Sequence, residues 1–209
     1  MVKVKEMPYS EKYMIAQDNI GFFESIFPPF IKEHLGDEAL IEHQNAWSEG
    51  IKPIPDNATI EDKYETAYSN WIWMAKSNFN FIREKMGEEG IKQLIRHETD
   101  ALIRKNAGAA TSFLGLIRAV APNYAFLMTN KEFSYQLQWI TPFNVTELNK
   151  DKAVFEIPQC KILDFENTED ICYVGCQKIY PLWAAEQFKI NMSFERKGKS
   201  CKCSIGHLN

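Results

Sequence analysis

Hydrophobic and polar positions along this chain follow two different periods. In residues 10–27, 59–86 and 88–106 the apolar positions recur mostly every three or four residues, which predicts helices. Residues 108–120 are small and apolar and are predicted to form another helix that ends before Pro122. The N-terminal two thirds of the chain is therefore expected to be helical.

Prolines and glycines predict where the helices of this part end and restart. Pro28 and Pro29 predict a helix end near residue 27, and Pro29 can begin a second helix that Gly36 caps before a third one starts. Residues 30–38 and 81–89 share one pattern, in which apolar and charged residues lead to a glycine and then to acidic residues. This echo indicates either an ancient duplication or the ordinary pattern of a glycine cap followed by an acidic first turn.

The period changes to two in the C-terminal third, where alternating residues are typical of half-buried strands. The predicted strands are residues 133–139, 143–148, 153–158, 189–195 and 200–205, with a helix at residues 171–188 between the third and fourth. This order predicts a single α+β domain over residues 1–209, in which a mainly helical part (1–130) packs with a cysteine-containing antiparallel sheet of about five strands (131–209).

Composition narrows the possible partners. The chain has 24 basic and 28 acidic residues, a net charge of −4 and 45% hydrophobic residues. Mixed charge of this kind provides no basic surface for a nucleic-acid backbone, so no nucleic-acid partner is expected. No apolar run is long enough to span a membrane, and residues 1–13 lack the apolar core of a signal peptide, so we expect a cytoplasmic protein with no membrane partner.

All five cysteines lie in the last quarter of the chain, which indicates a metal site, a reactive thiol or a locally cysteine-rich core. Cys172 and Cys176 share a helix face and Cys201 and Cys203 share a strand face, so these four thiols are candidate ligands for tetrahedral zinc. Their spacings, with three residues and one residue between partners, differ from the usual zinc knuckle. Alternatively, a helix N-terminus lowers the pKa of Cys172 or Cys176 and favours a nucleophile.

The cysteines also belong to longer motifs: FEIPQC at residues 155–160, ICYVGC at 171–176, FER at 194–196 with a glycine at 198, and CSI at 203–205. In these motifs the chain resembles the L-2-amino-thiazoline-4-carboxylic acid hydrolase-like family and, more distantly, the 4-vinyl reductase and TRAPP-like small-molecule-binding domains. The resemblance implies a small-molecule hydrolase with Cys160, Cys176 and Cys203 at its site. The acidic residue that the family often places after the helix cysteine is replaced by Ile179, and Glu186 is the nearest carboxylate on that helix.

Two functions follow from these observations. The first is a hydrolase that opens a C–N or C–S bond of a cyclic amidine or thiazoline-like substrate, with Cys176 as the nucleophile, Cys160 and Cys203 beside it and Glu186 as the acid. The second is a non-catalytic module that holds an apolar or planar ligand among structural cysteines. Zinc is the one cofactor that these cysteines indicate, and the sequence is compatible with a homodimer.

Two helical segments carry further candidate residues. Trp71 and Trp73 point to different sides of one helix, so one of them faces the core and the other a partner or a ligand cavity. His97, Glu98 and Arg104 are close in sequence, and such charged neighbours either face a cavity or, as is more usual, form a solvated helix face.

Overall fold

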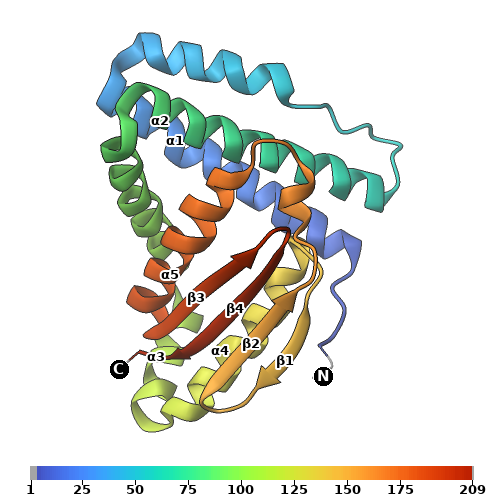
Figure 1. Ribbon diagram of the computed structural model, residues 1–209, viewed down its shortest axis with the longest axis vertical. Coiled ribbons are helices and arrows are strands. Elements are labelled where there is room, and N and C mark those ends of the chain that lie inside the picture. Colours follow the sequence, from blue (N-terminus) through green and yellow to red (C-terminus); the bar gives the residue numbers. More distant parts are fainter. Residues whose placement is uncertain (1–3, 209) are drawn as a thin grey trace.

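The computed structural model describes residues 4–208, apart from the side chains of residues 109 and 110. It begins with two long helices, α1 (Tyr9–Gly50) and α2 (Ile60–Lys105), which pack side by side across the top of Figure 1. The hydroxyl of Thr59 accepts a hydrogen bond from the backbone N–H of Asp62 and caps the start of α2, as its position before the apolar stripe predicts.

Each long helix is interrupted at a glycine. Gly36 in α1 has φ 85° and Gly87 in α2 has φ 65°, a backbone region that favours glycine. Acidic residues restart each helix and pair with the preceding turn, Asp37 with Lys32 and Glu88 with Arg83. The echo in the sequence thus corresponds to the same helix-break geometry at two sites.

The predicted helix end at residue 27 is wrong, because α1 continues through Pro28 and Pro29. Phe27, Phe30 and Ile31, on either side of the two prolines, are almost fully buried against α2. Burial of these large side chains holds the segment helical although proline removes a backbone donor.

Helices α3 (Ala109–Val120) and α4 (Pro122–Gln136) follow, with Pro122 at the first turn of α4. The strand expected at residues 133–139 is also wrong, since the segment forms the end of α4 and a 3-10 turn, η1 (Leu137–Trp139). Its apolar positions fit both periods, because Phe133 and Leu137 are four residues apart, as are Tyr135 and Trp139. Once the helix has started at Pro122, the same residues pack at helical spacing.

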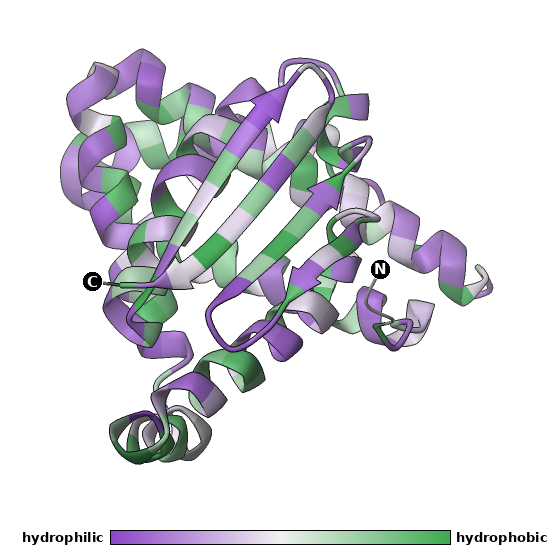
Figure 2. Ribbon diagram, turned by 60° about the horizontal axis from the view of Figure 1, so that its bottom comes forward, coloured by the Kyte–Doolittle hydropathy of each residue, from purple (hydrophilic) through white to green (hydrophobic). Residues whose placement is uncertain are grey.

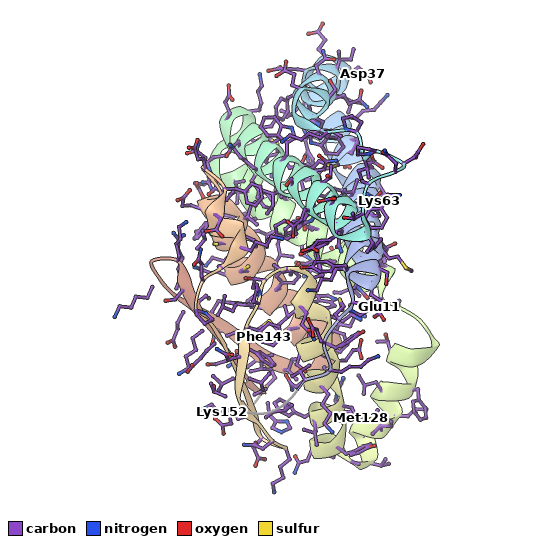
Figure 3. The ribbon with its side chains drawn as sticks, turned by 90° about the vertical axis from the view of Figure 1, so that its right-hand side faces the viewer. Glu11, Asp37, Lys63, Met128, Phe143 and Lys152 are labelled. Carbon is purple, nitrogen blue, oxygen red and sulfur yellow. The ribbon has the colours of Figure 1, made fainter. Side chains whose placement is uncertain are left out.

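The sheet contains four strands rather than five: β1 (Asn144–Leu148), β2 (Lys152–Ile157), β3 (Ile190–Lys197) and β4 (Ser200–His207). They are antiparallel in the order β1-β2-β4-β3. Figure 2 shows the sheet from its outer side with the helices behind it, and Figure 3 shows α4 beside the sheet and α1 and α2 stacked above. The architecture is α+β, with a helical N-terminal part and the sheet in the C-terminal part.

Residues 171–188 are helical, as their spacing predicts, but in three pieces: the π-helical η3 (Ile171–Ile179), α5 (Tyr180–Trp183) and the π-helical η4 (Ala184–Phe188). Pro181, which has no N–H to donate, lies between the two π-helical segments. A short 3-10 turn, η2 (Lys161–Asp164), connects β2 to this region. Within residues 4–208, no helix combines the length and the apolar character needed to cross a membrane.

The buried apolar residues form two clusters. The larger cluster lies between α1, α2 and the η2–η3 region, and the smaller one lies between the sheet, α4 and the α5–η4 region. The boundary between the two clusters is where the candidate site is found.

Candidate functional site

A cavity of about 480 Å³ separates the inner face of the sheet from the helices. Residues of strands β2, β3 and β4 line it from the sheet, and residues of α1, α2, α4, η3 and α5 line it from the helices. Most of the lining is apolar or aromatic, and it includes Phe133, Trp139, Phe143, Phe155, Ile157, Tyr180, Trp183, Met192 and Phe194. Figure 3 shows Phe143 in the segment that leads into β1, where the sheet and the helices meet.

Four of the five thiols line this cavity: Cys160, Cys172, Cys176 and Cys201. Cys160 follows β2, and Cys201 pairs in register with Ile157 of β2. Cys172 and Cys176 lie four residues apart on η3. Cys201 thus shares the cavity with Cys172 and Cys176, whereas Cys203 is buried in the sheet-side cluster and is not part of the lining among the described residues.

The thiols are protonated at neutral pH. Burial raises the pKa of all five, to about 11 for Cys172 and well above the ordinary value for Cys176. The guanidinium of Arg196, which also lines the cavity, lowers the pKa of Cys160, Cys172 and Cys201, but by less than burial raises it. The sequence argument expects a helix N-terminus to lower the pKa of Cys172 or Cys176, whereas burial raises the pKa of both thiols in the folded protein.

The four thiols do not form a tetrahedral zinc site in this structure. Among residues 4–208, no group of three or more His, Cys, Asp or Glu side chains is arranged to hold a metal ion. Cys172 packs in the helix-side cluster and Cys203 in the sheet-side cluster.

Glu186 does not lie beside the thiols. Its carboxylate pairs with the guanidinium of Arg96, which also binds Asp100, at the partly exposed surface of α2. This hydrogen bonding holds the pKa of Glu186 below its usual range. The position of Glu186 on η4 turns its side chain toward α2, and among the described residues it is not part of the cavity lining.

Glu98, which the sequence pattern favours as part of a solvated face, is buried and only 7% exposed. It lines a second, small cavity of about 30 Å³ between α1, α2 and η3. Within the described part of the chain, its Oε2 atom has no hydrogen-bond partner. Desolvation alone raises the pKa of Glu98 to about 8, so the carboxyl is largely neutral at pH 7.

The two cavities adjoin, because Cys176 and Tyr180 line both of them. Burial raises the pKa of the Tyr180 hydroxyl strongly, and the neighbouring Cys176 and Glu98 raise it further. Trp71 lines the small cavity, whereas the indole N–H of Trp73 donates to backbone carbonyls near the end of α1. Of the two tryptophans, Trp71 is therefore the one at a cavity.

The helices, the sheet and the two cavities together define an α+β protein with a mostly apolar cavity between sheet and helices and, beside it, a small cavity lined by a buried acid. No family model, no curated protein and no solved structure matches the chain.

Proposed function

We propose that this protein binds a small, largely apolar molecule in the cavity between the sheet and the helices. The observation that supports the proposal is the cavity itself, because about 480 Å³ lined mostly by apolar and aromatic side chains lies within the usual range of ligand sites. Burial of apolar ligand surface there supplies the main favourable free energy of binding.

The thiols fit this function as wall residues. A neutral thiol behaves as a small apolar group with a weak donor, and the raised pKa of Cys172 and Cys176 keeps these groups neutral at physiological pH. The ligand thus contacts sulfur atoms from η3 and β4 without an anionic thiolate near it.

The test measures the affinity for a neutral apolar dye, Nile red, from the change in its fluorescence on binding. The wild-type protein is compared with two variants, each changed at one of two adjacent residues. Cys201→Phe adds a ring into the cavity, and we expect it to weaken dye binding at least tenfold. Lys202→Phe adds the same ring on the exposed outer face of β4 and is the matched control. Equal dye binding by wild type and both variants contradicts the proposal.

The hydrolase that the family resemblance implies is a second candidate, favoured by one observation. Cys176 shares the small cavity with Glu98, so a carboxyl whose pKa is raised to about 8 is close to a thiol. This function requires one thiol that reacts quickly with iodoacetamide at neutral pH and whose reaction is lost in Cys176→Ser. Uniformly slow thiols and no bound metal by elemental analysis contradict it and leave ligand binding as the function.

A further inference from the structure

The small cavity is lined by a buried carboxyl group, that of Glu98, which has an oxygen atom without a hydrogen-bond partner among the described residues. Glu98 is placed on the second half of α2, is 7% exposed and has an Oε2 atom without a hydrogen-bond partner in the described residues. Most buried polar groups in folded proteins are paired, because an unpaired one costs free energy. An unpaired carboxyl at the end of a ligand cavity therefore points to a ligand group that completes it.

The walls around Glu98 are suited to a positive charge. Phe22, Phe23, Trp71 and Phe79 line the same cavity, and the faces of aromatic rings attract cations. Across the residues that the structure describes, no Lys, Arg or His lines this cavity, so no side chain of the protein supplies the charge. The titratable groups that face Glu98 are the Tyr180 hydroxyl and the Cys176 thiol, and its other polar neighbour is the amide of Asn19.

The volume of the small cavity and its position next to the larger cavity restrict the shape of the ligand. The small cavity of about 30 Å³ admits a compact head such as an ammonium group, since roughly 10–15 Å³ of such space holds one water-sized group. Cys176 and Tyr180 border both cavities, so the two cavities adjoin and a chain that leaves the head group extends past these residues toward the larger cavity.

We propose that the ligand is an apolar primary amine, whose ammonium group pairs with Glu98 inside the aromatic small cavity while its apolar part occupies the larger cavity. This inference rests on the proposed binding function and adds the chemical class of the ligand.

Charge balance makes the binding depend on pH. Free Glu98 is mostly protonated at neutral pH, because burial raises its pKa to about 8. When an ammonium ion binds, the carboxyl ionises and its proton leaves to solvent, which forms an ion pair with no net buried charge. Tyr180 and Cys176 stay neutral throughout, since the pKa of each is raised far above this range.

The experiment compares n-octylamine with n-octanol by titration calorimetry on the wild-type protein. The two probes have the same tail, and the amine stays protonated below about pH 10. We expect the affinity for octylamine to rise about tenfold from about pH 6 to about pH 7, with release of one proton per amine bound, and the affinity for octanol to stay constant.

Glu98→Gln provides the matched variant, with Glu186→Gln as a control for loss of an acid at the surface. We expect Glu98→Gln to lose at least tenfold in octylamine affinity at about pH 8 and to keep its octanol affinity within about twofold. The pH dependence and proton release of the wild type need no variant, so the test stands even where Glu98→Gln does not fold.

The outcomes separate the two proposals. Octanol and Nile red binding together with pH-independent octylamine binding overturns the amine inference and leaves the binding function in place. Absence of binding by octanol, octylamine and Nile red overturns both.

Discussion

Two buried polar residues on α2 lie in opposite surroundings. Asn78, before the Gly87 break, accepts hydrogen bonds on its Oδ1 atom from the indole N–H of Trp47 at 2.9 Å and shares a 2.7 Å hydrogen bond with Nε2 of His43. Glu98, after the break, faces a cavity with its Oε2 unpaired in the described structure. Asn78 also has an unpaired atom among the described residues, its Nδ2, so the two residues differ in what their side-chain oxygens face: protein side chains in a packed region at Asn78, and a cavity in a hollow region at Glu98.

The packed region should be the most sensitive to truncation. Phe27 is fully buried between α1 and α2, and we expect Phe27→Ala to lower the free energy of unfolding by about 4 kcal/mol. Phe194 lines the larger cavity and is half-buried, so Phe194→Ala should cost only about 1 kcal/mol. Urea denaturation measures the free energy of unfolding of both variants. Equal losses of stability would show that the two regions do not differ in packing.

The hollow region should instead respond to pH through Glu98. Its pKa is raised from 4.5 to about 8, so between these pH values the unfolded chain has released the proton that the folded chain keeps. Folding stability therefore falls as the pH rises through this window. Glu98→Gln removes this dependence, and its stability relative to wild type should increase by about 3 kcal/mol between pH ~4 and pH ~7.

Urea denaturation of both proteins across this pH range measures the difference. Parallel stability curves for wild type and Glu98→Gln would show that the carboxyl is not kept neutral by burial.

Removal of the polar contact in the packed region should have an intermediate effect. Asn78→Ala leaves the indole N–H of Trp47 and the ring of His43 without their shared partner, which we expect to cost about 2 kcal/mol. Thermal unfolding followed by tryptophan fluorescence checks this loss, with Asn70→Ala as a comparison because Asn70 binds the backbone of Lys52 nearer the surface. An unchanged midpoint for Asn78→Ala would mean that the network does not stabilise the helix pair.

The smallest effect is expected at the surface. Glu186→Gln breaks the ion pair with Arg96, and both side chains are partly exposed, so the loss should stay below about 1 kcal/mol and shrink at high salt. Ligand binding should not change, since Glu186 lies outside the lining of the larger cavity in the described residues. A large loss of binding would instead place Glu186 at the functional site.

The sequence predicted most elements where local chemistry decides them. Thr59 with Asp62 predicts the start of α2, Gly36 and Gly87 predict the two helix breaks, and alternation predicts β1, β2, β3 and β4. The prediction failed where a pattern fitted two structures. The apolar residues at 133–139 fit a strand and a helix equally, and only packing of α4 against the sheet distinguishes them.

The candidate site was predicted in part. Clustering of the cysteines pointed to the region where four thiols line the larger cavity, because residues near each other on η3 and on β4 share a face whatever the tertiary structure. Their protonation was not predictable, since the pKa of a thiol depends on how far the surrounding helices and strands exclude water. The distance of Glu186 from the thiols likewise depends on how η4 packs against α2.

The sequence by itself determined the α+β class, the helix breaks at the two glycines and the position of the cysteines on their elements, because these depend on residues close in the chain. Only the tertiary structure decided that Glu98 is buried, that its partner position is empty of protein groups among the described residues, and that two cavities meet at Cys176 and Tyr180. Burial and enclosure arise where α1, α2, η3 and the sheet converge, and no local pattern encodes that convergence.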